Sequence, residues 1–221
     1  MFNRIPPVVK NLIIINVIMF VATFIIGDFM YEKLSLFCFQ SPFFKPYQLL
    51  THMFMHGGFF HIFFNMYTLF IFGSVLENVW GGKKFLFYYL VTGLGAALLH
   101  NLTIYIELSS LANSVDAGNF INLMAQAQIN QILGTPTVGA SGAIYGLLLA
   151  YAMLFPNNVM QLIFPPIALK AKWFVLIFGV IELLSGLSGA GSNIAHFAHL
   201  GGMIFGYFLI IYWKKNNRMY Y

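Results

Sequence analysis

The chain alternates between long apolar stretches and short polar connections. The apolar stretches cover roughly residues 11–29, 57–77, 85–106, 138–155, 173–190 and 194–213. A helix of about 20 apolar residues crosses the hydrocarbon core of a bilayer. The pattern therefore predicts six transmembrane helices, packed as a single domain over residues 1–221.

The fourth stretch is shorter than the others and rich in glycine. It has about 18 residues, begins after Pro136 and contains Gly139, Gly142 and Gly146. Backbone N–H and C=O groups do not remain unpaired in lipid. We therefore expect this span to lie inside the bundle, where protein or a water-filled cavity meets its ends.

Composition narrows the class of protein. Hydrophobic residues make up 60% of the chain and charged residues 8%, against ~45–50% and ~25% in soluble domains. So few charges exclude a soluble globular domain and a disordered chain. The single cysteine, Cys38, excludes a disulfide-stapled secreted module. The expected fold class is an all-α polytopic membrane protein.

The basic residues are divided unevenly between the two sets of connections. Lys33 and Lys45 lie in one set. The other set holds the remaining nine: Arg4, Lys10, Lys83, Lys84, Lys170, Lys172, Lys214, Lys215 and Arg218. The positive-inside rule then predicts that both termini are cytoplasmic, in agreement with an even number of spans. We interpret the net charge of +5 as this orientation signal and infer no nucleic-acid partner from it.

Two outer connections are long enough to have structure of their own. Residues 30–51 are too broken to span, and around Pro42 and Pro46 they carry Phe37, Phe39, Phe43, Phe44 and Tyr47. We expect this segment to lie in the membrane interface. Residues 107–135 are the most polar stretch and indicate an external loop with a short helix around 119–132.

Polar side chains inside apolar spans are costly and indicate function. Two candidates, His56 and His196, lie at the mouth of the second span and in the sixth span. The others are His61 and Asn65 as a pair in the second span, Ser141 and Tyr145 as a pair in the fourth, and His199 in the sixth. With the amino terminus inside, all three spans run from outside to inside, which places these side chains at one depth near the outer face. Each pair is spaced i,i+4 and so projects from one helix face.

Small residues predict how two of these spans pack. Gly142 and Gly146 lie beside Ser141, and Gly202 and Gly206 share a face with His199. Such faces let two helix backbones approach closely in lipid. Packing them together would bring His199 to Ser141, the pairing that an activated serine nucleophile requires.

The neighbours of this pair suit acyl transfer. Ser141 lies at a helix amino terminus, where free N–H groups favour a developing negative charge. His61 and Asn65 are candidate donors to the oxyanion, and Tyr145 is placed to pack on the His199 ring.

No Asp or Glu shares the depth of the histidine by this interpretation. Glu77 and Glu182 are placed near the inner ends of their spans by this interpretation. We therefore expect a Ser-His dyad with no acidic third member.

Three motifs in order resemble the rhomboid family of intramembrane serine proteases. They are His52, His56, His61 and Asn65 leading to Gly73 and Glu77; Gly139-Ala140-Ser141-Gly142-Ala143-Ile144-Tyr145-Gly146; and Ala198-His199-Leu200-Gly201-Gly202 with Gly206. The resemblance covers all six spans. By similarity, Ser141 matches the nucleophile and His199 the base. His61 and Asn65 match the oxyanion pair, and Tyr145 matches the residue that stacks on the base.

The resemblance also implies an activity and a setting. The family cleaves transmembrane segments of membrane proteins through an acyl-enzyme, so single-span proteins are the expected substrates. No metal and no organic cofactor are implied. The expected location is a bacterial cytoplasmic membrane with the site open to the external face. Substrate would enter past the second and fifth spans, with the 185–193 connection as a mobile cap.

Two alternatives remain open from the residues alone. A metal-dependent membrane hydrolase would use the histidines as ligands, starting from the i,i+4 pair His52 and His56 and adding His61, His196 and His199. Against it, Gly57 and Gly58 disturb the helix after His56. The other alternative is a non-catalytic relative that binds transmembrane helices. Between the two histidines of the sixth span, spacing to the glycines favours His199 over His196 as the base.

Overall fold

The structure is a computed structural model that describes residues 5–115, 120–161, 167–188 and 193–216. Its elements, in chain order, are α1 (Pro7–Ile26), α2 (Asp28–Leu34), α3 (Gln48–Thr51), the 3-10 turn η1 (His52–Phe54), α4 (Phe59–Thr68), the π-helical turn η2 (Leu69–Gly73), α5 (Ser74–Trp80), α6 (Gly82–Val115), α7 (Phe120–Gly134), α8 (Ser141–Leu154), β1 (Val159–Gln161), β2 (Ala168–Lys170), α9 (Ala171–Ser188) and α10 (Asn193–Lys215).

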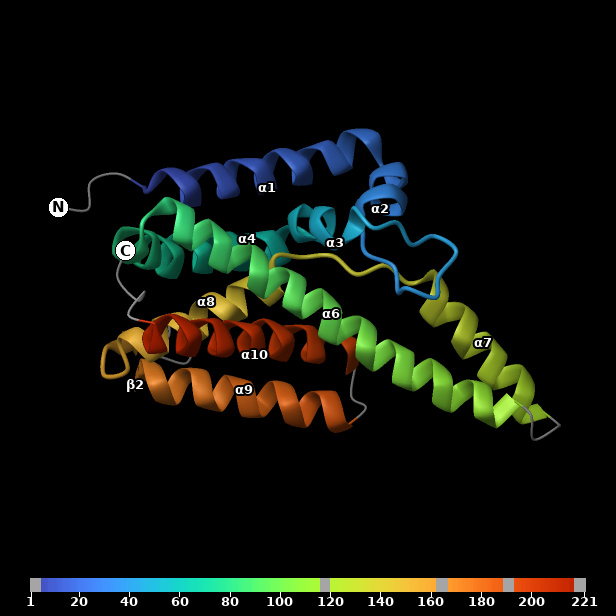
Figure 1. The fold of residues 1–221 in the computed structure, drawn as a ribbon. Coiled ribbons are helices and arrows are strands. Elements are labelled where there is room, and N and C mark those ends of the chain that lie inside the picture. The colour runs from blue at the N-terminus through green and yellow to red at the C-terminus, as the bar shows by residue number, and fades with distance from the viewer. Residues whose placement is uncertain (1–4, 116–119, 162–166, 189–192, 217–221) are drawn as a thin grey trace.

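The long helices form a bundle around α6, α8 and α10. The helix α10 packs against both α6 and α8, while α9 lies along α10 and α1 lies on the far side of the bundle (Figure 1). The start of α1 and the end of α10 lie at the same end of the bundle (Figure 1). That placement is what an even number of crossings requires.

Five of the described helical segments are long and apolar enough to cross a membrane: Pro7–Ile26, Phe59–Trp80, Gly82–Asn113, Ala171–Ser188 and His196–Lys215. The remaining predicted span, the fourth, is the 14-residue apolar helix α8, which is too short to meet that standard. Most of α8 is buried among the other helices, as the short, glycine-bearing stretch predicted. The expectation of an all-α polytopic bundle is confirmed, and the count of six spans stays a prediction.

The outer surface of the bundle is apolar. Large side chains such as Phe24, Ile25 and Leu184 are between 60% and 80% exposed. An exposed apolar surface of this size has to be covered by another apolar phase. For helices of this length, that phase is lipid.

The 107–135 segment differs in part from its prediction. The helix of the third predicted span, α6, continues past residue 106 to Val115. At 1.5 Å per residue, its 34 residues reach ~51 Å. The short helix expected around 119–132 is α7, which packs back against the distal half of α6 through Leu108 and Ile132 (Figure 1). The segment is therefore mostly a helical hairpin instead of an open loop.

The outer segment 30–51 is organised by one buried side chain. Gln48 accepts hydrogen bonds from the backbone N–H groups of Phe37 and Lys45, and its amide donates to the carbonyls of Lys33 and Phe43. These four bonds let an irregular segment pair its backbone without strands or long helices. The interfacial location of the segment stays a prediction.

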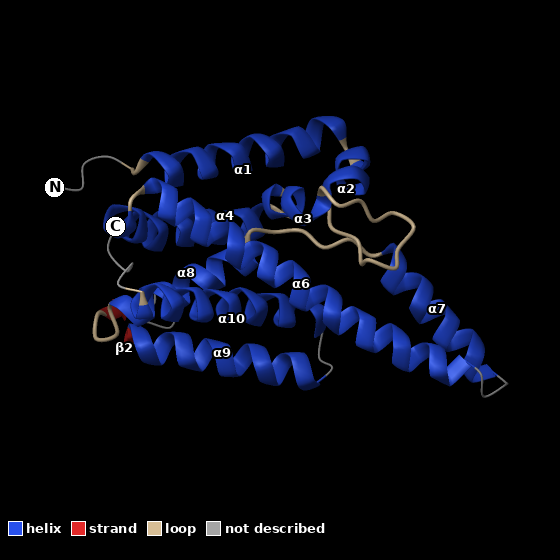
Figure 2. Ribbon diagram, in the orientation of Figure 1, coloured by secondary structure: helices blue, strands red, loops and turns tan. Residues whose placement is uncertain are grey.

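The connection between α8 and α9 contains the two strands of the described residues (Figure 2). They pair antiparallel, with Met160 opposite Leu169. Strands of three residues are too short to produce a periodic pattern in the sequence, so none was predicted here.

Candidate active site

Ser141 and His199 come together although 58 residues separate them in the chain. Ser141 is the first residue of α8, and His199 lies near the start of α10. The distance between Ser141 Oγ and His199 Nε2 is 2.9 Å. This is hydrogen-bond distance, in the geometry that a serine nucleophile and its general base need.

Close contact between two helices produces this pairing. A Cβ atom added to Gly202 would overlap the Gly142 carbonyl oxygen, so α10 and α8 touch backbone to backbone within one turn of the pair. Gly146 and Gly206 differ from the expected arrangement. Both face α6, Gly146 against the Thr92 side chain and Gly206 against the Tyr88 hydroxyl.

The approach to Ser141 is held by backbone hydrogen bonds from two other segments. Thr137 pairs with Leu36 in both directions, at 2.9 and 2.8 Å, and the Gly139 N–H donates to the His52 carbonyl at 2.9 Å. Gly139 has φ 130°, a backbone conformation that residues other than glycine rarely adopt. The turn therefore presents Ser141 at the free amino terminus of α8, where N–H groups are available to a ligand.

Tyr145 lies one turn after Ser141 and contacts the histidine directly. Its ring is stacked on the His199 ring, with centroids 4.2 Å apart and planes 5° apart. The stacked tyrosine ring limits rotation of the imidazole about the His199 Cβ–Cγ bond. The Tyr145 hydroxyl extends beyond the stack and donates to Glu182 Oε1.

Glu182 contacts the candidate site, which the sequence interpretation did not predict. Its Oε2 lies 2.6 Å from His196 Nδ1 and 3.1 Å from His199 Nδ1. The expectation that no carboxylate lies at the depth of His199 is therefore wrong. The helix α9 runs antiparallel to α8 and α10, so Glu182, in its carboxyl-terminal half, lies toward the same end as the starts of α8 and α10 (Figure 1). The predicted direction of the fifth span was the sequence signal that could have revealed the position of Glu182.

His61 and Asn65 approach the site from α4. The Gly57 N–H lies 3.4 Å from His61 Nδ1 in donor geometry, which leaves the proton on Nε2. A Cβ atom built on Gly139 would lie 2.8 Å from that Nε2 and 3.6 Å from Ser141 Oγ, so His61 reaches the serine side of the cavity. Asn65 is buried, and its Nδ2 has no partner among the described residues. Both side chains thus have an N–H group available.

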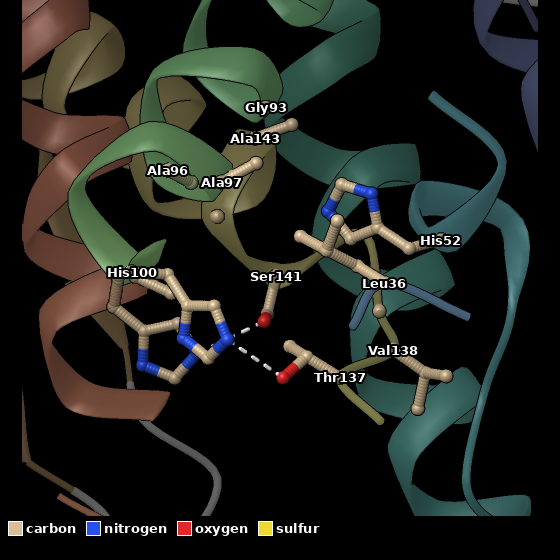
Figure 3. Close-up of a pocket in the computed structure, with 14 residues that line it drawn as sticks. Leu36, His52, Gly93, Ala96, Ala97, His100, Thr137, Val138, Ser141 and Ala143 are labelled. Atoms are coloured by element: carbon tan, nitrogen blue, oxygen red, sulfur yellow. Dashed lines mark hydrogen bonds between the residues drawn. The ribbon is translucent and has the colours of Figure 1, made fainter. Parts of the chain in front are cut away.

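A small cavity of about 50 Å³ lies beside the pair. Its wall includes Ser141, His199, His52, His100 and Thr137 (Figure 3). The cavity is large enough for water, and several polar groups face it. His100 is buried, and its Nε2 lies 2.8 Å from the Thr137 hydroxyl.

His52 and His56 lie outside the span that begins at Phe59, and both are buried. Burial lowers the pKa of His52 to about 4. Burial, aided by the neighbouring His61, lowers the pKa of His56 to about 4. Both rings are therefore neutral at physiological pH. His52 Nδ1 lies 2.8 Å from the Gln48 carbonyl, which fits a bracing role.

The metal-ligand set expected for a metallohydrolase does not form from the histidines named in the sequence. Within the described residues, the side chains close enough to share an ion are Glu182, His196 and His199, whose ligand atoms lie within 4.8 Å of one another. Two ligand atoms of one tetrahedral zinc ion are separated by roughly 3.3 Å. The 2.6 Å between His196 Nδ1 and Glu182 Oε2 is a hydrogen-bond distance instead.

The expected mobile cap at 185–193 lies largely outside the described residues, which end at 188 and resume at 193. Its first part, to Ser188, is the last turn of α9.

Comparison with known proteins places the chain in a family. Residues 44–216 match the Rhomboid domain. The chain is 28% identical to "Rhomboid protease AarA" of Providencia stuartii over 156 residues, which are 70% of this chain and 51% of that protein. It is 28% identical to "Putative rhomboid protease YdcA" of Bacillus subtilis over 177 residues, 79% of this chain and 71% of that protein.

A mitochondrial protein matches to a similar degree. The human "Presenilin-associated rhomboid-like protein, mitochondrial" is 28% identical over 174 residues, 76% of this chain and 40% of that protein. The chain thus spans about half the length of the Providencia relative and less of the human one.

Proposed function

Because this chain belongs to the rhomboid family, we propose that it is an intramembrane serine endopeptidase with Ser141 as nucleophile and His199 as general base. The observation that carries the proposal is the 2.9 Å contact between Ser141 Oγ and His199 Nε2. The substrates are transmembrane segments of single-span membrane proteins. The chain acts as an integral protein of a bacterial cytoplasmic membrane, with its site toward the external face.

The first chemical step is acylation of the serine. Ser141 Oγ attacks the scissile carbonyl carbon while His199 Nε2 takes the hydroxyl proton. The imidazolium then gives that proton to the leaving amine as the C–N bond breaks, which leaves an ester on Ser141. Tyr145 keeps the imidazole facing the serine through both transfers, because its stacked ring restricts rotation.

The negative charge that forms on the substrate carbonyl oxygen needs hydrogen-bond donors on the side of the site opposite His199. His61 Nε2–H and Asn65 Nδ2–H are available there, together with the free N–H groups at the start of α8. Loss of one oxyanion donor typically lowers turnover by ~10²–10³.

Hydrolysis of the ester requires water at the same serine. The cavity of about 50 Å³ reaches Ser141 and His199. His199 Nε2 removes a proton from the water as it attacks the ester carbon, and the proton then returns to Ser141 Oγ. The enzyme is regenerated with no metal and no organic cofactor.

The test is cleavage of a tagged single-span substrate by the purified full chain in liposomes. Ser141→Ala and His199→Ala are expected to remain folded and to lose cleavage by at least about 10³-fold, since each removes a reacting group. Ser109→Ala is the matched control, because Ser109 is exposed and its hydroxyl donates to the Tyr105 carbonyl within its own helix. Cleavage by Ser141→Ala at the rate of the parent would overturn the proposal. A folded parent that binds substrate without cleaving it would favour the non-catalytic alternative.

A metal-dependent hydrolase is the second candidate, because Glu182, His196 and His199 form a ligand-like cluster. A strong chelator separates the two candidates. The serine mechanism predicts unchanged cleavage after chelation, together with labelling of Ser141 by a fluorophosphonate. Loss of cleavage that added zinc restores would support the metal mechanism instead.

A further inference from the structure

The Glu182 carboxylate is buried beside the reacting histidine although the reaction above leaves it without a role. Glu182 is 7% exposed and enters the site from α9, whereas Ser141 and His199 belong to α8 and α10. A buried charge is costly unless several donors meet it. Its neighbours supply those donors.

Three donors face the two oxygens of this carboxylate. Tyr145 Oη donates to Oε1. His196 Nδ1 lies 2.6 Å from Oε2, and His199 Nδ1 lies 3.1 Å from the same oxygen. An ionised carboxylate only accepts hydrogen bonds, so this arrangement suits the charged form.

The contact with His199 decides which ring nitrogen carries the proton. His199 Nδ1 is buried, and Glu182 Oε2 is the acceptor nearest to it, although the approach is oblique in this state. A proton on Nδ1 leaves the lone pair on Nε2, which points at Ser141 Oγ. A general base needs that tautomer, and catalytic hydrogen bonds of this kind often straighten only when substrate binds.

We propose that Glu182 is a positioning residue that fixes the His199 tautomer and stabilises the imidazolium formed when Ser141 attacks. This proposal rests on the proposed serine protease function and deepens it. The site then works as a serine, a histidine and a carboxylate from three helices. The carboxylate gains no proton and forms no bond to substrate.

Tyr145 links the two halves of this arrangement. Its ring stacks on His199, and its hydroxyl holds Oε1, so Oε2 is left to face the two histidines. Replacing Tyr145 by Phe removes the hydroxyl while it keeps the stacked ring. That variant therefore tests the carboxylate's position without removing the carboxylate.

His196 shares the carboxylate with His199. Because His196 holds Oε2 at the shorter distance, it competes with His199 for the same acceptor. His196→Ala leaves Oε2 free for His199, so we expect it to lower cleavage less than Glu182→Gln does.

The experiment measures kcat and KM for a fluorogenic single-span substrate across pH, in liposomes containing the full chain. Glu182→Gln keeps the shape and removes the charge. We expect kcat to fall by roughly 10- to 100-fold with KM within about threefold, less than the ~10⁴ seen for a soluble triad, since Tyr145 still holds the ring. The acidic limb of the kcat/KM profile is expected to shift to lower pH, because the imidazolium loses its counter-charge. A residue with only a structural role would leave that limb in place.

The titratable groups that face His199 within the described residues are few. They are Glu182 from α9, His196 from α10, Tyr145 from α8 and His61 from α4. His100 from α6 and His52 line the cavity that His199 also lines. Glu32→Gln is the matched control, since it makes the same chemical change at an exposed position on α2. Its profile is expected to match the parent in kcat and in both limbs.

Each outcome decides between two statements. Parental kcat and an unchanged profile in Glu182→Gln, with Ser141→Ala inactive, would overturn the role of Glu182 and leave the protease function standing. Parental cleavage by Ser141→Ala would overturn the function itself. If Glu182→Gln fails to fold, Tyr145→Phe decides instead. A kcat loss of about 3- to 10-fold there supports the proposal, and parental kcat overturns it. A greater loss in His196→Ala than in Glu182→Gln would also overturn it.

Discussion

At the start of α1, two backbone N–H groups meet the carboxylate of Glu77. Val8 N donates to Oε1 at 3.0 Å and Val9 N to Oε2 at 2.8 Å, and Glu77 is buried. The first turn of a helix has N–H groups without partners and a positive dipole end. One side chain from α5 satisfies two of these groups, so Glu77 ties α1 to the bundle.

Glu77→Ala is predicted to weaken this attachment. It leaves two N–H groups without an acceptor at a largely buried helix end, at a cost of about 2–5 kcal/mol in unfolding free energy. Thermal unfolding in detergent, followed by tryptophan fluorescence, measures the loss. Glu77→Gln retains one acceptor oxygen and is expected to fall between Ala and the parent. Equal midpoints for Glu77→Ala and the parent would contradict the capping role.

The buried histidines before the second span predict a pH-dependent stability. The pKa values of His52 and His56 are lowered to about 4, against about 6.5 in an unfolded chain. Between those values the unfolded chain binds more protons than the folded one, so stability falls as pH decreases from about 6.5 to about 4. Above about pH 6.5 the stability does not change with pH through these two residues.

The measurement is the unfolding midpoint between pH 7.5 and pH 4.5. His52→Gln and His56→Gln remove one titrating ring each, so the decrease in midpoint with pH should become smaller in each variant. A variant that follows the parent's pH dependence in full would show that its histidine is not buried in neutral form.

At the scale of elements, the contact between α8 and α10 sets the catalytic distance. The backbones touch at Gly142 and Gly202, and Ser141 and His199 lie within one turn of that contact. Helices that touch without intervening side chains have a fixed separation, whereas long side chains would allow several. The 2.9 Å between nucleophile and base therefore depends on glycine at position 202.

Gly202→Ala is predicted to separate the two helices. The added methyl group overlaps the Gly142 carbonyl, and backbone cannot move aside as a flexible side chain does. We expect at least about a 10²-fold loss in kcat, since a shift of about 1 Å at the reacting atoms has that effect. Gly134→Ala is the control, because its Cβ meets nothing within 4 Å. Parental activity in Gly202→Ala would show that the contact does not set the distance.

At the scale of the whole molecule, the bundle combines an apolar exterior with a polar site near one end. The exposed faces carry side chains such as Phe24 and Leu184, while the site residues lie on the inner faces of α4, α8, α9 and α10. Lipid can therefore surround the bundle while water reaches Ser141 through the cavity beside it. The end predicted to face the cytoplasm is the one whose connections carry the excess of Lys and Arg.

The predicted orientation can be measured with single cysteines in a Cys38→Ala background. Lys83 and Gln128 are both exposed and lie in connections assigned to opposite sides. A membrane-impermeant maleimide added to intact bacterial cells is expected to label Gln128→Cys and to label Lys83→Cys only after permeabilisation. The reverse pattern would invert the topology.

Much of the architecture could be predicted from hydropathy alone. Five of the six predicted spans correspond to long apolar helices, and the short fourth stretch is the buried helix α8. Spacing also indicated that His61 and Asn65, or Ser141 and Tyr145, share a helix face, because i,i+4 neighbours always do. The helix of the third predicted span, α6, continues past residue 106 to Val115, through residues whose polarity resembles that of a loop.

Apolar length determined that this protein belongs in a bilayer, and the uneven distribution of lysine and arginine determined the orientation that we predict for it. These are properties of residues against their solvent, so the order of amino acids is enough to read them. Which side chains touch across helices was decided only by tertiary structure. Glu182 reaches His199 because two antiparallel helices bring residues 17 positions apart to one depth, and helix rotation and separation are set by packing contacts that no single segment contains.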